Sequence, residues 1–273
     1  MVKVAFYGEA GSFSEESAMG YFGKKARLLS CKSFSEIFET MKNSAAYGVI
    51  PVENSIGGAV SQAYDLITAS GFAVVGEIKK RISHSLIANP ATRINDVKYV
   101  YSHPQALDQC REYIEKTGLI AISFQDTAGS VKMLKEKGLM DSAAIASERA
   151  ARIYGMKILK NHLETNNHNY TRFFVIGKKR IVPKGRCKTS IMFITKHASG
   201  SLYWALGCMK DNGINMTYIQ SRPVIGKAWE YSFFVDFEGG SLDPNVKKML
   251  RELKAFTYKI RILGSYRAAA EPS

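Results

Sequence analysis

Short runs of β-branched and aromatic residues alternate with helical patterns along the first two thirds of this chain. The runs are VKVAFYG, YGVIPV, FAVVGEI, VKYVYS, LIAISF and FFVIG. The helical patterns cover residues 33–43, 59–69, 105–116 and 128–137, where apolar positions recur three and four residues apart. Strands and helices in alternation favour crossover connections, so this order predicts an α/β fold with substantially parallel sheets.

The pattern changes after a basic stretch at residues 178–188, in which six of eleven residues are Lys or Arg. Pro183 and Gly185 within this stretch are typical of a solvated linker. Beyond it we expect a strand (TSIMFITK), a helix at 200–211, two strands (INMTYIQSRPV and EYSFFVDF), a helix at 244–256 and a strand (YKIRIL). The order βαββαβ predicts a second, ferredoxin-like domain.

The charge of the chain raises the question of a nucleic-acid partner. Lys and Arg number 38 against 24 Asp and Glu, which gives a formal net charge of +14. The basic residues are scattered along amphipathic stretches, and no zinc-finger or RNA-recognition signature is present. We therefore expect no nucleic-acid partner.

The cysteines and the apolar segments indicate the compartment. The four cysteines are far apart and form no C-x-x-C pair, which favours reduced thiols over a disulfide framework or a zinc site. No stretch approaches eighteen consecutive apolar residues, and the N-terminus enters a strand pattern without a signal-peptide core. We expect a cytoplasmic protein with no membrane partner and no metal.

The segment GEAGSFSE, residues 8–15, follows the first predicted strand. Its spacing matches neither G-x-x-x-x-G-K-[ST] nor G-x-G-x-x-G, so nucleotide binding is not expected. Ser12 and Glu15 instead form a capping-box pattern, in which each side chain accepts a hydrogen bond from a free backbone N–H. The segment predicts a capped helix that begins near Ser12.

Polar residues also follow other predicted strands. Asn54 and Ser55 come after YGVIPV, Pro104 suits the first helical position after VKYVYS, and Asp126 or Thr127 could cap the helix after LIAISF. Helix N-termini at the carboxyl ends of parallel strands gather at one edge of a sheet and favour anions. We expect the first domain to bind a small anionic ligand.

The run YTRFFVIG places Thr171 next to Arg172. A guanidinium can bind a carboxylate with two parallel hydrogen bonds, and a threonine hydroxyl can donate one bond to a reacting oxygen. A half-buried strand with Arg172 in a surface salt bridge explains the spacing equally well. The residues alone leave both interpretations open.

Several uncommon motifs together resemble the prephenate dehydratase family along nearly the whole chain. They are GSFSEESA, VIPVENSIGGAV, VYSHPQAL, DTAGS, AAIAS, YTRFFVIG, SGSLYWAL and QSRP. The resemblance implies a catalytic domain at residues 1–180, similar to type II periplasmic-binding proteins, and an ACT domain at 189–267. One lobe would comprise about 1–79 with 168–180 and the other about 80–167, with the active site between them.

The resemblance also implies the reaction: prephenate loses water and carbon dioxide and gives phenylpyruvate, a step of phenylalanine biosynthesis that needs no cofactor. Thr171 belongs to the T-R-F motif of the family and is expected to be catalytic, as the donor to the leaving oxygen. Arg172 is expected to clamp a carboxylate and to have Glu53 as its partner, and His103 is expected to cap a helix. The remaining residues expected to bind substrate are Ser12, Asn54, Ser55, Thr127 and Phe173.

The second domain resembles the family's effector module, which binds phenylalanine between paired copies. The family's Gly-Ala-Leu motif here reads Gly200-Ser201-Leu202, and its Glu-Ser-Arg-Pro motif here contains Gln220, which removes a charge. We expect a homodimer or homotetramer inhibited by L-phenylalanine. The residues expected to bind this effector are Gly200, Ser201, Leu202, Asn215, Gln220, Ser221, Arg222 and Pro223.

Two alternatives remain at this point. Arogenate dehydratase carries out the same elimination on a substrate with an amino acid side chain, and one sequence does not separate the two. A non-catalytic, amino-acid-sensing binding protein would use the same two folds. The clusters Thr171-Arg172-Phe173 and Glu53-Asn54-Ser55 favour catalysis, because a sensor would not need a hydroxyl donor beside a carboxylate clamp.

Overall fold

The computed structural model describes residues 1–181, 183–224, 226–227 and 229–270, and these residues form two compact units. The first unit comprises Met1–Gly58 and Lys79–Phe173. The second comprises Ala59–Ile78 and residues 174–270. The chain therefore passes from one unit to the other several times, and each unit contains segments that are distant in sequence.

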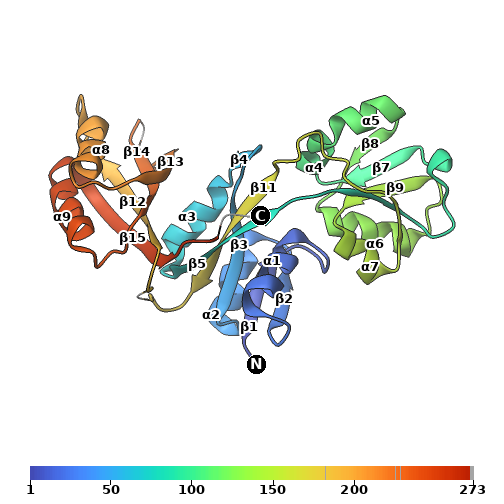
Figure 1. The fold of residues 1–273 in the computed structure, drawn as a ribbon, viewed down its shortest axis with the longest axis horizontal. Helices are drawn as coiled ribbons and strands as arrows, with labels where there is room; N and C mark the ends of the chain where they lie inside the picture. The colour runs from blue at the N-terminus through green and yellow to red at the C-terminus, as the bar shows by residue number, and fades with distance from the viewer. Residues whose placement is uncertain (182, 225, 228, 271–273) are drawn as a thin grey trace. The chain divides into compact units, whose positions relative to one another are not determined.

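The first sheet has the strand order β2-β1-β3-β11-β5, with β4 paired to β3 (Figure 1). Strand β1 is parallel to both neighbours, and Val4 pairs with Leu28 on one side and Tyr47 on the other. The elements in chain order are β1 (Lys3–Tyr7), α1 (Phe13–Phe22), β2 (Arg27–Cys31), α2 (Phe34–Asn43), β3 (Tyr47–Asn54), β4 (Gly58–Ala59), α3 (Ser61–Ser70) and β5 (Ala73–Arg81), and β11 (Tyr170–Gly177) returns later.

The second sheet has the order β10-β6-β9-β7-β8 and lies entirely within the first unit. Strands β7, β8 and β9 are parallel, whereas β6 is antiparallel to both β9 and β10. Its elements are β6 (Ser85–Ala88), the 3-10 turn η1 (Ile94–Asp96), β7 (Tyr99–Ser102), α4 (Pro104–Gln109), α5 (Arg111–Thr117), β8 (Ile120–Ser123), α6 (Thr127–Lys137), β9 (Ser142–Ala146), α7 (Glu148–Tyr154) and β10 (Lys157–Lys160).

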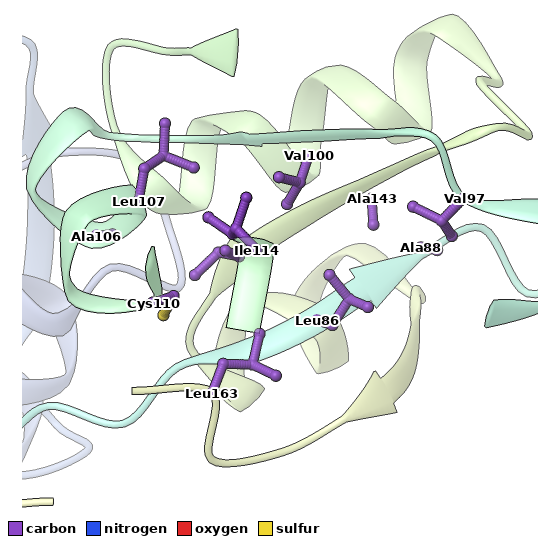
Figure 2. Packing of buried hydrophobic residues seen from close by; sticks show 11 residues of the cluster. Leu86, Ala88, Val97, Val100, Ala106, Leu107, Cys110, Ile114, Ala143 and Leu163 are labelled. Atoms are coloured by element: carbon purple, nitrogen blue, oxygen red, sulfur yellow. The ribbon is translucent and has the colours of Figure 1, made fainter. Parts of the chain in front are cut away.

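Side chains of this second sheet alternate between two apolar layers. Leu86 and Ile145 join a cluster with Leu107 and Ile114 of α4 and α5, which Figure 2 shows together with their neighbours. The next residue along β6, Ile87, packs instead with residues of α6 and α7. Because successive strand residues point to opposite faces, helices cover both sides of the sheet. The result is a three-layer α/β/α arrangement.

The third sheet is antiparallel, with the order β13-β14-β12-β15. Phe193, Val235 and Phe237 pack on one of its faces against the apolar sides of α8 and α9, including Met209 and Met249. The elements are β12 (Cys187–Thr195), α8 (Ser201–Asp211), β13 (Met216–Pro223), β14 (Tyr231–Glu238), α9 (Pro244–Leu253), the 3-10 turn η2 (Lys254–Phe256) and β15 (Thr257–Arg267). This is the expected order βαββαβ.

Residues 59–78 belong to the same compact unit as the third sheet. The ring of Tyr64 on α3 stacks on Tyr218 of β13, with ring centroids 5.4 Å apart, and contacts Phe234 of β14. The buried carboxylate of Glu77 on β5 pairs with Lys188 of β12 at 2.9 Å. The segment that carries α3 and the start of β5 is thus attached to the βαββαβ sheet by packing and by charge.

Three sequence-based expectations need correction. The first two sheets contain the expected parallel pairs, but the second sheet is mixed, because β6 runs against both of its neighbours. The helix expected at 105–116 is broken at Cys110, where α4 ends and α5 begins. The strand YGVIPV is longer than expected, since β3 continues to Asn54 and β4 follows, whereas α3 (Ser61–Ser70) lies close to the helix expected at 59–69.

Candidate active site

Asn54 is the hydrogen-bonding centre of a polar cluster in the first unit. Its side chain lies at the end of β3 and is 6% exposed. Oδ1 accepts bonds from the backbone N–H groups of Ile56 and Gly57, at 3.1 and 2.8 Å. Nδ2 lies 3.0 Å from Oγ1 of Thr171 on β11. The tight turn after β3 thereby orients the amide toward Thr171.

The neighbouring Ser55 fixes the strand that carries Thr171. Its backbone N–H donates to the carbonyl of Tyr170 at 2.8 Å. Its hydroxyl accepts from the N–H of Tyr170 at 2.9 Å and donates to the carbonyl of His168 at 3.0 Å. The hydroxyl of Ser55 thus makes one bond as donor and one as acceptor, both to backbone.

Three buried amide side chains form a closed ring. Nδ2 of Asn54 donates to Oδ1 of Asn169 at 2.8 Å. Nδ2 of Asn169 donates to Oε1 of Gln109 at 2.9 Å, and Nε2 of Gln109 donates to Oδ1 of Asn54 at 3.3 Å. Asn169 is fully buried and Gln109 is 9% exposed. We call Asn54, Gln109 and Asn169 the amide ring.

Sequence analysis missed Gln109, Asn169 and Gln105, whose Nε2 also donates to Oδ1 of Asn54 at 3.3 Å. Gln105 and Gln109 lie one helical turn apart on α4, so they occupy the same side of that helix. This spacing of two amides, directly after a predicted strand, was the sequence signal that could have identified Gln105 and Gln109 as site residues. Asn169 lies in an irregular segment and gave no periodic signal.

Arg172 is held by Glu53 from the adjacent strand. Nε of Arg172 lies 2.8 Å from Oε2 of Glu53, and the arginine side chain is 8% exposed. Glu53 was expected to be the partner of this arginine, and the ion pair confirms that contact. Phe173 lies in the core, 2% exposed, so its ring packs among apolar groups.

Ser12 is the N-cap of α1, as predicted, and its hydroxyl accepts from the N–H of Glu15 at 3.3 Å. The carboxylate of Glu15 accepts from the N–H of Gly11, one residue earlier than the usual capping box. The same carboxylate pairs with Arg149, and the carbonyl of Gly11 accepts from the Ser147 hydroxyl. Ser12 makes no hydrogen bond to the amide ring within the described residues.

Two further strand-to-helix corners are capped. His103 caps α4, where Nδ1 accepts from the N–H of Gln105 at 3.2 Å, so its expected role as a cap is confirmed. Asp126 caps α6 by accepting from the N–H of Gly129 at 2.7 Å, and burial raises the pKa of its carboxyl group. Thr127 is the first residue of α6, and in the described part of the chain it does not bond to the amide ring.

The residues expected to bind an effector lie on two elements of the second unit. Gly200 is the N-cap of α8 with a φ of 77°, a left-handed conformation that suits glycine. Ser201 is buried, and Leu202 packs against the core of the βαββαβ sheet. Asn215 lies just before β13 and donates to Glu238.

The motif on β13 occupies the edge of that sheet, because β13 has β14 as its only neighbour in the strand order of the described chain. Nε2 of Gln220 donates to the carbonyl of Ser221 at 3.0 Å, and Pro223 is exposed. Arg222 pairs with Asp65 of α3 at 2.7 Å. The motif expected to bind an effector therefore contacts α3 directly.

No group of three or more His, Cys, Asp or Glu that could hold a metal occurs within the described residues. The same part of the chain contains no helix long and apolar enough to cross a membrane. The four cysteines are free, and burial raises the pKa of the Cys110 thiol far above its usual range. A thiol in this state is a poor nucleophile.

A mixed α/β unit with a buried amide cluster and a hydroxyl beside it, together with a βαββαβ module, defines a two-part α/β protein. The family model for prephenate dehydratase matches residues 4–181. The chain belongs to the prephenate dehydratase family.

Curated relatives match over nearly the whole chain. The bifunctional chorismate mutase/prephenate dehydratase of Aquifex aeolicus is 39% identical over 268 residues, which cover 97% of this chain and 73% of that protein. The arogenate dehydratase/prephenate dehydratase 2, chloroplastic, of Arabidopsis thaliana is 36% identical over 277 residues, which cover 97% and 72%.

Solved structures also match over nearly the whole of this chain. Prephenate dehydratase from Arthrobacter aurescens in complex with L-Phe is 26% identical, with a TM-score of 0.90 over 98% of this chain and 90% of that one. GqqA, described as a novel type of quorum quenching acylase, is 30% identical, with a TM-score of 0.89 over 97% and 98%. The similar structures thus include proteins described by two different activities.

Proposed function

We propose that this chain catalyses the decarboxylating dehydration of prephenate to phenylpyruvate. The observation that carries the proposal is the 3.0 Å contact between Nδ2 of Asn54 and Oγ1 of Thr171, within the region that matches the prephenate dehydratase model. The match supplies the reaction class. The contact brings a hydroxyl to the amide cluster from a strand that is distant in sequence.

The chemistry requires stabilisation of a poor leaving group. The electron pair left by departing carbon dioxide enters the ring, which becomes aromatic as the C–O bond at the opposite ring carbon breaks. The prephenate dianion takes up one proton overall and gives phenylpyruvate, carbon dioxide and water. A strong base is not required, but the departing oxygen needs a hydrogen-bond donor.

Thr171 is the donor in this proposal, and it acts mainly by position. A threonine hydroxyl near its ordinary pKa is a weak acid, so a preorganised hydrogen bond to the developing negative charge contributes more than full proton transfer. The bond from Asn54 to Oγ1 polarises the hydroxyl and holds it in place. Asn54 thus supports the donor.

The dianionic substrate needs positive charge and polar contacts. Arg172 is proposed to bind a carboxylate, with Glu53 orienting the guanidinium through Nε. Ser12, Ser55 and Thr127 are proposed as polar lining, and Phe173 as the apolar support of Arg172's strand. No cofactor or metal enters the proposed reaction, because the leaving carbon dioxide itself supplies the electron pair.

The domain arrangement follows the same proposal. Residues 1–180 form the catalytic domain, of the periplasmic-binding type, with lobes at about 1–79 plus 168–180 and about 80–167. Residues 189–267 form an ACT domain that binds L-phenylalanine between paired copies in a homodimer or homotetramer, in the cytoplasm. The βαββαβ order and the L-Phe complex of the Arthrobacter aurescens protein support the effector assignment.

The test of the activity is incubation of the purified chain with prephenate and, in parallel, with arogenate. Phenylpyruvate is detected by its ultraviolet absorption in base, and phenylalanine by chromatography. Higher kcat/KM on prephenate supports the proposal, and higher kcat/KM on arogenate assigns the chain to the alternative that the Arabidopsis thaliana relative's name also carries. No turnover of either compound rejects the proposed function.

An acylase is the second candidate, favoured by the similarity to GqqA. An acylase of the serine type would need an activated serine, and the hydroxyl of Ser83 lies 3.0 Å from Nδ1 of His162. The carboxylate of Glu164 lies 3.8 Å from that same nitrogen. An activated serine needs the two partners on opposite ring nitrogens, so this arrangement does not form a triad. Release of fatty acid from an N-acyl homoserine lactone would nevertheless support this candidate.

A further inference from the structure

We propose that Asn169 and His84 are positioning residues that hold the Asn54 amide against Thr171, because they complete the amide ring in the polarity that the backbone at Ile56 and Gly57 imposes. The proposal rests on the proposed function, since Thr171 is its donor. It assigns a role to two buried residues outside every motif discussed so far.

The orientation of the Asn54 amide follows from the backbone. The N–H groups of Ile56 and Gly57 both point at the same atom of that side chain, at 3.1 and 2.8 Å. A backbone N–H can only donate, so this atom must be the oxygen. The amide nitrogen therefore faces Asn169 and Thr171.

The orientation of the other two amides follows in turn. Nδ2 of Asn54 has two hydrogens, and one of them meets Asn169 at 2.8 Å, so the facing atom of Asn169 must be oxygen. Nδ2 of Asn169 then donates to Oε1 of Gln109 at 2.9 Å, and the nitrogen of Gln109 turns to Oδ1 of Asn54. The hydrogen bonds therefore run around the ring in one direction, from Asn54 to Asn169 to Gln109 and back to Asn54, and only this direction gives every donor an acceptor.

His84 adds a second constraint on the ring. Its Nε2 lies 3.0 Å from Oε1 of Gln109, which already accepts from Asn169. A carbonyl oxygen accepts only, so His84 must carry its hydrogen on Nε2. His84 is 2% exposed, and burial lowers the pKa of its imidazole, which favours the neutral form. Nδ1 meets no hydrogen-bond partner among the described residues, which suits an unprotonated nitrogen.

The consequence reaches Thr171. The second hydrogen of Asn54 Nδ2 points toward Oγ1 of Thr171 at 3.0 Å and the carbonyl of Tyr170 at 3.2 Å. Oγ1 is thereby an acceptor toward Asn54, so the hydrogen of the hydroxyl remains available for a substrate oxygen. If the ring ran in the opposite sense, the oxygen of Asn54 would face Oγ1 and would capture that hydrogen.

The test compares the steady-state kinetics of four variants on prephenate. Asn169→Asp removes the donor to Gln109, and His84→Leu removes the donor from Nε2, so we expect each to lower kcat by about 10- to 100-fold with little change in KM. His84→Gln can offer an N–H at the same reach and should recover most of the activity. Asn89→Asp is the matched control, because it removes a side-chain donor to the carbonyl of Leu139 far from this ring and should leave kcat unchanged.

A second measurement reads the polarity directly. The ¹⁵N shifts of the imidazole should show hydrogen on Nε2 of His84 in the wild-type protein, whatever its catalytic activity. Wild-type turnover with unchanged kcat in Asn169→Asp and His84→Leu would overturn the proposal, as would hydrogen on Nδ1. If Asn169→Asp does not fold, the two His84 variants decide, since equal losses in both contradict a role for the N–H. Absence of turnover in the wild-type protein rejects the proposed function, and the tautomer still tests the ring.

Discussion

Nε of Arg172 lies 2.8 Å from Oε2 of Glu53, between the adjacent strands β11 and β3. The arginine side chain is 8% exposed and the glutamate side chain 35% exposed, so the pair extends from the core toward solvent. The ion pair thus connects the guanidinium to the neighbouring strand. This geometry keeps the charged group rigid for a carboxylate ligand.

Arg172→Lys should raise the KM for prephenate by about 10-fold or more with a smaller effect on kcat. Lysine keeps the charge but lacks the planar fork that binds a carboxylate bidentately and holds Glu53 through Nε. Steady-state kinetics at constant ionic strength measures both parameters. Glu53→Gln is the companion variant and should have a smaller effect on KM, because it leaves the guanidinium of Arg172 in place. A lysine variant with unchanged KM would contradict the clamp.

Thr171→Ala should lower kcat by about 10²- to 10⁴-fold, the range for a positioned acid or a preorganised donor, with KM little affected. Thr171→Ser keeps the hydroxyl and is the matched control, which should retain a large part of the activity. Single-turnover measurement of phenylpyruvate formation separates chemistry from product release. Wild-type turnover in the alanine variant would refute the assigned donor.

The parts of the fold that periodicity could predict are those with a strong local signal. The βαββαβ order of the second unit was read correctly, because its helices carry clear apolar stripes and its strands are long. Strands β9 and β6 were missed, since SAAIA and SLIA are short and fully buried on both faces. Such runs show no alternation, and alanine has low strand propensity.

Site residues could be predicted from the sequence only where they belong to a recognisable motif. Thr171 and Arg172 stood out by their sequence motif. Asn169 did not, because its importance comes from a ring closed with partners 60 and 115 positions away. The mutual orientation of three amides is a property of tertiary structure, and no local pattern encodes it.

Asp65→Asn should weaken inhibition by phenylalanine without changing turnover in its absence. Asp65 on α3 pairs with Arg222 of the proposed effector motif at 2.7 Å, and both belong to the second unit. Both side chains are partly exposed, so the pair adds little to stability, but a displacement of β13 by effector would act directly on α3. We expect the phenylalanine concentration for half-inhibition to rise by about fivefold or more.

The control for this prediction is Glu230→Gln, which removes an exposed ion pair with Lys227 in the same unit. It should leave the inhibition curve unchanged. Curves for Asp65→Asn that superimpose on those of the wild-type protein would exclude this ion pair from the coupling.

Gly264→Ala should destabilise the second unit. A Cβ at Gly264 on β15 would lie 2.0 Å from the carbonyl oxygen of Val74, a backbone atom on β5. Overpacking against backbone typically costs about 1–3 kcal/mol. Gly207→Ala on α8 is the opposite control, since no heavy atom lies within 4 Å and helical alanine gains about 0.5–1 kcal/mol over glycine. In urea unfolding, Gly264→Ala should have a lower midpoint than the wild-type protein and Gly207→Ala a higher one. Equal midpoints for Gly264→Ala and the wild-type protein would contradict the close contact.

The buried imidazole of His84 should make the protein less stable in mild acid. Burial lowers the pKa of His84, outweighing the opposite effects of Gln109 and Glu164. The unfolded chain takes up this proton near pH 6.5, at the ordinary pKa of histidine, whereas the folded chain does so only at lower pH.

Below about pH 6.5 the unfolded state therefore binds more protons at this site, and the free energy of unfolding falls as pH falls, until the folded-state pKa is reached. One group contributes at most about 1.4 kcal/mol per pH unit. His84→Gln removes this titration. Between pH 7.5 and pH 5 the free energy of unfolding, measured with urea, should therefore fall less in the variant than in the wild-type protein. Parallel profiles of the two proteins would show that His84 titrates alike in the folded and unfolded states.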